Sequence, residues 1–269
     1  MRVRLISAAA LLLAFAAAAP AGAIEWKQIE EGVETTETAI APDAETGSVP
    51  LFIVRIDPAK VRISVLDPVL AVSKAGRASG AFSLREMLGI DAPSAVINGG
   101  FTGSFTYPVP TGLVRHAGDT RSPLNAASTT QSGVFCVRNG TPSILAKSGY
   151  SSGSCDEALQ SGPRVVERPG KNGIHRNERD GTLHQRSIVG IDARGRLLFL
   201  RSGPAHLFDL AEFLLREEEA GGLSCTVALN LSGDLESGVG VRDSGGSLEL
   251  RGEVDVTIAS AIGVFRREP

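Results

Sequence analysis

The residues best suited to chemistry lie in a turn at positions 230–237, directly after an alternating apolar run at residues 227–231. The alternation indicates a buried strand, and a glycine just after such a strand is typical of backbone that lies close to a ligand. The turn carries one hydroxyl and two carboxyls, Ser232, Asp234 and Glu236. A carboxylate can act as a base or a nucleophile, so these three residues are the catalytic candidates. An ordinary strand end with a solvated turn fits the same stretch.

Three further segments combine polar side chains with glycine or follow an apolar strand in the same way: residues 98–101, 160–163 and 186–187. Amide side chains offer donors and acceptors to sugar hydroxyls, and arginine can hold a phosphate through two hydrogen bonds. Glycine turns point backbone N–H groups at an anion. The combination predicts a site for a sugar phosphate. The substrate-binding candidates are Asn98, Gly99, Gly100, Gln160, Ser161, Arg186, Asn230, Gly233 and Ser237.

Each candidate also has a purely structural interpretation. Asn98 can cap a turn, and Gln160 can bond to neighbouring backbone. Arg186 can end a strand at the surface, and the two acidic residues of the turn can simply be solvated. His184 can share a strand face with Arg186, but a solvent-exposed histidine is the simpler interpretation.

Other familiar chemistries have little support. The four histidines show neither HExxH spacing nor a CxxC partner, so no histidine- or thiolate-bound metal and no cofactor is predicted. A metal held by acidic oxygens stays open. Residues 149–153 match GxSxG, a motif that marks a nucleophile only as a sharp turn between a strand and a helix. A serine hydrolase using Ser151 is therefore the least favoured hypothesis.

The first 23 residues have the features of a secretory signal peptide. Arg2 and Arg4 precede an apolar run at residues 5–19, and the small residues 21–23 suit cleavage. We therefore expect an exported protein, either periplasmic or secreted. The apolar run is too short and alanine-rich for a good membrane span, and no later segment has the roughly 20 apolar residues that a span needs. An integral membrane protein is not expected.

Charge and cysteine content narrow the possibilities further. The net charge is −3 at pH 7 and the basic residues are scattered, which argues against nucleic-acid binding. Three cysteines allow at most one disulfide within the chain in an oxidising compartment. Proximity in the sequence favours Cys136 with Cys155, while Cys155 with Cys225 stays open.

Strand patterns outnumber helix patterns. Residues 51–56 and 61–66 are each closed by Asp-Pro and resemble a hairpin. Two further hairpins are indicated, at residues 133–146 around Asn139-Gly140 and at residues 186–201.

Two helices are predicted between these strands. Ser83 can cap a short helix that Gly89 would end, before a strand at residues 95–97. A second helix begins at Asp209, with Glu212 completing a capping box. The expected fold is α+β, with a mixed, mainly antiparallel sheet and a few packed helices. We expect a single domain at residues 51–269, after an N-terminal extension at residues 24–50.

The order of these segments resembles the phosphodiester glycosidase family. Its pattern runs approximately Asn-Gly-Gly-Phe-Phe, Pro-x-Gly-Leu, Leu-Gln-Ser-Gly-Pro, Arg-Thr/Ser-x-x-Gly and Asn-Leu-Asp-Gly-Gly-x-Ser. The corresponding segments here are residues 98–102, 110–113, 159–163, 186–190 and 230–237. The resemblance covers most of residues 50–265. It implies an α+β domain with one cleft and hydrolysis of a sugar 1-phosphodiester.

The last segment departs from this pattern. Ser232 stands where a carboxylate is expected and Asp234 where the second glycine is expected, while Thr102 replaces a phenylalanine. A serine hydroxyl is neutral at physiological pH and cannot replace a carboxylate without a base of its own. Two accounts stay open. Asp234 or Glu236 supplies the charge, or the domain has lost hydrolysis and binds a sugar or phosphoglycan.

The leading hypothesis is an exported, hydrolase-like domain that acts on a sugar 1-phosphodiester of the cell envelope or of an extracellular glycan. The alternative is a non-catalytic module that binds sugar or phosphoglycan. The sequence leaves open whether the protein is an enzyme.

Overall fold

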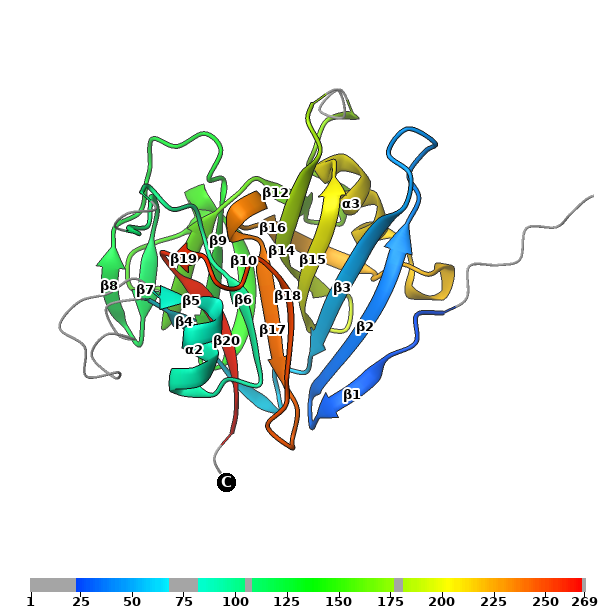
Figure 1. Ribbon diagram of the computed structural model, residues 1–269. Helices are drawn as coiled ribbons and strands as arrows, with labels where there is room; N and C mark the ends of the chain where they lie inside the picture. The colour runs from blue at the N-terminus through cyan, green and yellow to red at the C-terminus, as the bar shows by residue number, and fades with distance from the viewer. Residues whose placement is uncertain (1–22, 68–81, 105–107, 177–180, 268–269) are drawn as a thin grey trace, which may run out of the picture.

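The computed structural model describes residues 23–67, 82–104, 108–176 and 181–267, and it is predominantly β (Figure 1). The predicted signal peptide, residues 1–23, lies outside this part except for its last residue. Within the described ranges, three larger sheets and a two-stranded one are accompanied by two α-helices. No helix in these ranges is long and apolar enough to cross a membrane.

The largest sheet has eight strands, and each is antiparallel to its neighbours. In spatial order they are β1 (Lys27–Glu30), β2 (Val33–Ile40), β3 (Val49–Ile56), β15 (Leu197–Ala205), β14 (His184–Asp192), β16 (Cys225–Asn230), β12 (Arg164–Glu167) and β13 (Lys171–Asn172). Successive side chains of a strand point to opposite faces. In β15, Leu197 and Phe199 therefore enter the central core, while Leu198 and Leu200 pack on the opposite face. Burial on both faces explains why the first four residues of this strand, 197–200, are all apolar.

Two five-stranded antiparallel sheets complete the central core. The first is β18 (Leu248–Gly252), β17 (Gly238–Arg242), β6 (Ala95–Asn98), β20 (Ala261–Arg266) and β4 (Val61–Leu66). The second is β10 (Thr141–Ala146), β9 (Gly133–Arg138), β11 (Glu157–Ser161), β7 (Val114–His116) and β8 (Asp119–Ser122). Phe52, Ile97 and Phe135 each come from a different larger sheet and belong to one buried cluster. All three sheets are thus held to the same core.

The helices cover the outer faces of two sheets (Figure 1). Helix α3 (Leu207–Leu215) packs Leu210 and Phe213 on the eight-stranded sheet. Helix α2 (Leu84–Asp91) packs Leu84 and Leu88 on the sheet that contains β17 and β6. The small sheet of β5 (Phe82–Ser83) and β19 (Thr257–Ile258) adjoins α2. Short 3₁₀ turns lie at η1 (Lys147–Gly149), η3 (Glu218–Ala220) and η4 (Asp234–Glu236).

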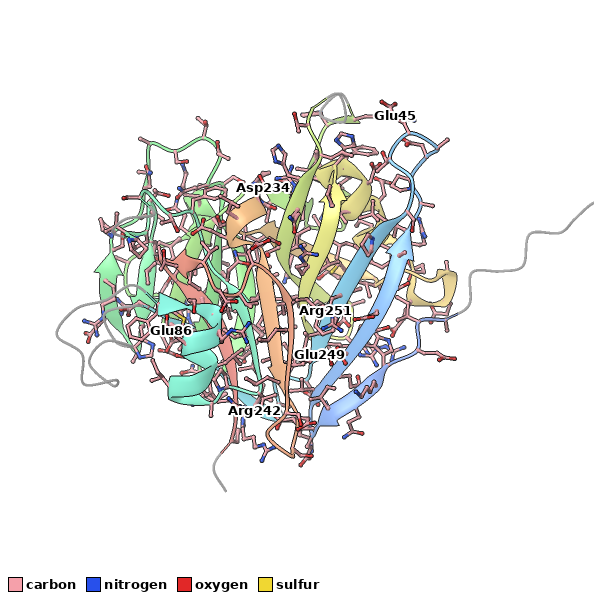
Figure 2. The ribbon with its side chains drawn as sticks, viewed as in Figure 1. Glu45, Glu86, Asp234, Arg242, Glu249 and Arg251 are labelled. Atoms are coloured by element: carbon pink, nitrogen blue, oxygen red, sulfur yellow. A yellow bond between two sulfur atoms is a disulfide. The ribbon has the colours of Figure 1, made fainter. Side chains whose placement is uncertain are left out.

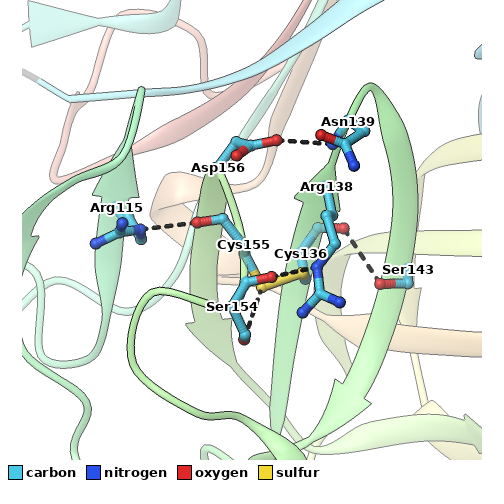
Figure 3. The surroundings of a disulfide bond; sticks show 8 residues. All are labelled: Arg115, Cys136, Arg138, Asn139, Ser143, Ser154, Cys155 and Asp156. Carbon is cyan, nitrogen blue, oxygen red and sulfur yellow. Dashed lines mark hydrogen bonds between the residues drawn. A yellow bond between two sulfur atoms is a disulfide. The ribbon is translucent and has the colours of Figure 1, made fainter.

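The sheet that contains β9 and β11 carries a disulfide. Cys136 of β9 is bonded to Cys155, just before β11, with their Cα atoms 5.6 Å apart (Figure 3). This confirms the pairing that sequence proximity favoured. Cys225 is buried and free, and burial raises the pKa of its thiol, so it is an unreactive core residue.

Several predicted elements need correction. The fold is predominantly β rather than a balanced α+β, and every strand pair in the described part of the chain is antiparallel. Strands β3 and β4 do not form a hairpin, because β3 pairs with β2 and β15 while β4 pairs with β20. The Asp-Pro turn between β3 and β4 instead carries the chain from one sheet to another. The hairpins β9–β10 and β14–β15 are confirmed.

The helix boundaries differ from their sequence signals where packing extends a helix. The capping box of Ser83 and Glu86 is present, but α2 continues past Gly89 because Ile90 still packs on the core. Helix α3 starts at Leu207 rather than at a cap on Asp209, because Leu207 also packs against the sheet. Apolar contact decided both ends, overriding the local stop and cap signals.

Candidate active site

The candidate residues converge because neighbouring antiparallel strands bring the end of β16 beside the start of β14. Asn230 is paired in register with Ile188, and the Leu231 N–H donates to the Ser187 carbonyl at 2.8 Å. The chain then turns through η4, drawn in orange above β17 in Figure 1, where Figure 2 labels Asp234. The polar turn expected after the Val227 strand therefore lies at the end of β16, an inner strand of the largest sheet.

A pocket of about 460 Å³ opens beside this turn. Its wall combines the strand ends, the turn and the start of α3. The lining residues are Phe101, Thr130, Gly162, Pro163, His184, Arg186, Leu207, Asn230, Ser232, Gly233, Asp234, Leu235 and Glu236. All three predicted catalytic residues line the pocket, together with Arg186, Asn230 and Gly233 from the binding candidates.

Glu236 is the buried carboxylate of this pocket, with only 4% of its surface exposed. One carboxylate oxygen accepts a hydrogen bond from the Ser232 hydroxyl and the other accepts one from the Thr102 hydroxyl. Burial raises the pKa of Glu236, and the two hydroxyls partly oppose that rise. A carboxyl whose pKa lies above its ordinary value is suited to exchange protons closer to neutral pH.

Arg186 supplies a cation to the same pocket. Its Nε is buried and has no hydrogen-bond partner among the described residues. Burial lowers the pKa of its guanidinium, opposed by the charge of Asp234. An arginine stays protonated at neutral pH in any protein setting, so this side chain offers positive charge and an unused donor to an anion.

Asp234 has a different environment from Glu236. Its side chain is 54% exposed, and its two oxygens accept from the Gln185 backbone N–H at 3.1 Å and contact His184 Nδ1 at 2.7 Å. Its φ of 48° lies in the left-handed region, which favours glycine but which aspartate also tolerates. This explains how an aspartate occupies a position where the family pattern has glycine.

Asn98 lies behind the pocket and holds the turn in place. Its Nδ2 donates to the Ser232 carbonyl at 2.7 Å, and its Oδ1 accepts from the Gly238 N–H at 3.1 Å. One buried side chain thus joins the start of the turn to the first residue beyond it. Its amide is engaged by protein on both sides, which is the structural interpretation noted for it from sequence.

Gln160 also anchors backbone, in another loop. Its Oε1 accepts from the N–H groups of Leu113 and Asn125, and its Nε2 donates to the carbonyls of Asn125 and Gln131. All four bonds go to main chain, and Gln160 does not line the pocket. By contrast, Asn230 uses its Nδ2 on the Gly162 carbonyl at 3.0 Å, while its buried Oδ1 has no partner among the described residues.

The remaining candidates are three closely packed glycines and two buried serines. A Cβ on Gly99 would lie 2.2 Å from the Ser260 hydroxyl, one on Gly100 would lie 2.5 Å from the Gln160 carbonyl, and one on Gly233 would lie 2.6 Å from the Gln185 carbonyl. Only glycine fits at these positions without displacing backbone. The Ser237 hydroxyl contacts the Ser187 hydroxyl at 3.1 Å, and Ser161 is fully buried.

Other candidate chemistry lies elsewhere or is not assembled. Ser151 is exposed in the loop between η1 and β11, so the strand-to-helix turn that GxSxG requires is absent there. No group of three or more metal-ligating side chains occurs within the described residues.

The contact between Thr102 and Glu236 has no signal in the local sequence. The two residues are 134 positions apart, and no local pattern relates them. The only available signal was that two unusual residues, Thr102 and Ser232, occur in one set of segments.

Comparisons with known proteins agree with this architecture. A model of the phosphodiester glycosidase family matches residues 91–265, more than half of the chain. No curated protein sequence matched.

Among solved structures, similarity extends over most of the chain. The catalytic domain of zebrafish N-acetylglucosamine-1-phosphodiester alpha-N-acetylglucosaminidase, auto-inhibited by its pro-peptide, is similar at 15% identity and a TM-score of 0.67, over 91% of this chain and 87% of that one. A hypothetical protein from Synechocystis is similar at 15% identity and a TM-score of 0.61, over 92% of this chain and 64% of that one. A putative exported protein from Burkholderia pseudomallei has 11% identity and a TM-score of 0.53, over 82% of this chain and 74% of that one. At these identities the likeness concerns the fold.

Proposed function

Because the chain belongs to the phosphodiester glycosidase family, we propose that it hydrolyses the bond between the anomeric carbon of a sugar and a phosphodiester, with Glu236 as the catalytic carboxylate. The observation that carries this proposal is the meeting of a buried carboxylate, Glu236, and a cation with an unused donor, Arg186, in one pocket. Family membership alone leaves activity open, because Ser232 occupies the place of the expected carboxylate.

Arg186 and Asn230 supply complementary binding groups. The guanidinium suits the phosphate, whose oxygens accept hydrogen bonds and carry negative charge. The free Oδ1 of Asn230 suits a sugar hydroxyl, which can donate to it. A sugar linked to phosphate presents both partners across one bond, so the two side chains would hold the ester on either side of the scissile bond.

Glu236 would act as a general base towards water. The water oxygen attacks the anomeric carbon and its proton passes to the carboxylate, while the bond from that carbon to the phosphate oxygen breaks with its electron pair. The phosphate monoester departs as an anion next to Arg186. A phosphoryl leaving group is already weakly basic, so the reaction needs less general-acid help than that of an ordinary glycoside.

The Cys136–Cys155 disulfide supports a second part of the proposal, that the protein works outside the cytoplasm. Such bonds persist in oxidising compartments and are rare in reducing ones. The substrate class that fits is therefore a sugar phosphodiester of the envelope or of an extracellular glycan.

The test is to incubate purified protein with a panel of sugar 1-phosphodiesters and to measure release of reducing sugar, using Glu236→Gln, Arg186→Met and the control Thr226→Val. Thr226 donates its hydroxyl to the Ile191 carbonyl on β14, outside the pocket. We expect turnover by wild type and by the control, and loss of about 10²-fold or more in each pocket variant. Binding of the panel without turnover by wild type would identify a binding module and overturn the enzymatic proposal.

A further inference from the structure

Two departures from the family pattern touch the same carboxylate. Thr102, where the pattern has phenylalanine, donates its hydroxyl to Glu236 Oε1, and Ser232, where it has an acidic residue, donates to Glu236 Oε2. Thr102 follows β6 in one sheet and Ser232 follows β16 in another. The meeting is therefore produced by tertiary structure, from segments that have no local relation.

These hydroxyls meet a specific physical need of Glu236. A glutamate has three side-chain torsions, and a single hydrogen bond would leave its two oxygens free to exchange places. Two donors on opposite oxygens fix the plane of the carboxylate and replace part of the water that burial removes. Neither donor is charged, so the carboxyl keeps access to both of its protonation states.

The same contacts leave room for only one carboxylate. The Ser232 hydroxyl touches Glu236, so an acidic side chain at position 232 would bring two carboxyls together. Two carboxylates that share a site cannot both ionise readily. An acid at 232 and an acid at 236 are therefore alternatives, and the charge expected at 232 is supplied here from one turn further along the chain.

We propose that Thr102 and Ser232 are positioning residues that hold Glu236 in the place of a carboxylate at 232, so that the pocket accepts one acid at either position but not at both. The inference rests on the proposed function for its catalytic consequence, while its geometric content stands on the hydroxyl contacts. The other charged or titratable groups lining this pocket are Arg186, His184 and Asp234.

A four-member cycle tests the exchange of positions: wild type, Ser232→Asp, Glu236→Gln and the double variant. We expect kcat to fall about 100-fold or more in Glu236→Gln and to recover at least about tenfold from that level in the double variant. Ser232→Asp alone should shift the rising limb of the pH–rate profile to higher pH, because the paired acids hold a proton. A double variant no more active than Glu236→Gln would overturn the exchange.

The positioning roles have their own readout, titration of the Glu236 carboxyl by ¹³C NMR, which does not require turnover. Both hydroxyl bonds lower the pKa of Glu236, so Thr102→Val and Ser232→Ala should each raise it, and Thr102→Ser should restore it. Thr226→Val is the matched control and should change nothing, and His184→Gln in each background removes the nearby histidine titration. An unchanged Glu236 titration in both hydroxyl variants would overturn the positioning roles.

The two proposals fail in distinguishable ways. Absence of turnover in wild type, with the NMR shifts as expected, would refute the hydrolytic function. It would leave the positioning roles of Thr102 and Ser232 intact. Turnover that Glu236→Gln leaves intact would refute the catalytic assignment. Turnover lost in Glu236→Gln, with titrations insensitive to Thr102 and Ser232, would refute only the positioning inference.

Discussion

Two buried glutamates in this molecule have opposite surroundings. Glu157 of β11 accepts from the Val65 N–H at 2.8 Å and the Ala117 N–H at 3.0 Å, and it contacts His116 Nδ1 at 3.2 Å. Glu236 accepts from two side-chain hydroxyls, and the Thr102 backbone also bonds to it. Backbone donors and a histidine hold Glu157, whereas no cation among the described residues is bonded to Glu236.

The difference separates a structural carboxylate from a functional one. Glu157 joins β4 of one sheet to β7 of another through its hydrogen bonds. It also raises the pKa of its histidine partner, His116. Glu236 instead lines the pocket that also holds Arg186, Asn230 and Ser232. Burial of an acid is therefore a weak indicator of function, and the donors around it are more informative.

The largest expected effect is the difference in kcat between Glu236→Gln and Glu157→Gln. Glu236→Gln should lower kcat by about 10²–10⁴-fold, because it removes the base and keeps the shape. Glu157→Gln should leave kcat within about threefold of wild type, since Glu157 lies outside the pocket. Steady-state kinetics on a sugar 1-phosphodiester measures both, and equal losses in the two variants would remove the distinction.

The second effect concerns stability, for which Glu157→Gln should be the more damaging of the two substitutions. Glu157→Gln should lower the free energy of unfolding by about 1–3 kcal/mol, because it leaves a buried donor poorly satisfied. Glu236→Gln should cost nothing at neutral pH, since it removes a charge from a buried position. Denaturant titration at pH 7 compares them, and a destabilised Glu236→Gln would show that the carboxylate is structural.

A third effect is the pH dependence of the stability of Glu236→Gln relative to wild type. The pKa of Glu236 is raised above its ordinary 4.5, so its protonated form favours folding and that stability is lost as the pH rises through the folded-state pKa. Wild type and Glu236→Gln should therefore have similar Tm values below pH 4.5, and the variant should gain relative to wild type at higher pH. A difference that does not vary with pH would contradict the raised pKa.

A fourth effect, at His116, follows the same direction with pH but begins with a destabilised variant. Its pKa is raised above 6.5, mainly by the hydrogen bond to Glu157, so the charged pair stabilises the fold below that pH and the contribution is lost as the pH rises through the folded-state pKa. His116→Gln should be less stable than wild type below pH 6.5, and the difference should shrink at higher pH. Thermal melts from pH 5 to 9 would check this, and a deficit that grows with pH would refute it.

The smallest effect concerns the other carboxyl of the turn. Asp234 is exposed and has a positive φ, so Asp234→Gly should relieve backbone strain while losing the contact with His184. We expect these to offset within about 0.5–1 kcal/mol and kcat to change less than about tenfold. A larger loss of kcat, measured beside that of Glu236→Gln, would transfer the catalytic charge to Asp234.

Local signals predicted those parts of the fold that depend on neighbouring residues. The Asn139-Gly140 turn predicted hairpin β9–β10, and Ser83 with Glu86 predicted the start of α2, because each is stabilised within a few residues. The pairing of β3 and β4 was wrong for the opposite reason. Adjacent strands with a short turn usually pair, and only the competing partners β15 and β20, far along the chain, decide that these do not.

The candidate site divides in the same way. Residue types and glycine turns in the sequence were sufficient to select Arg186, Asn230 and the acidic turn, which the structure brings to one pocket. The sequence could not distinguish the two acids of that turn, since both are carboxylates two residues apart. Left-handed backbone at Asp234 directs one acid to solvent and to His184, while η4 directs the other inward to Ser232.

The sequence by itself determined the family segments, the strand-rich character and the set of polar residues available for chemistry, because these are properties of residue type and spacing. Tertiary structure alone decided that Asn98 and Gln160 bind backbone, and that Thr102, in the segment after β6, contacts Glu236. The physical reason is that protonation and hydrogen bonding depend on which groups are within about 3 Å in space. That arrangement is fixed only when three sheets close on a common core.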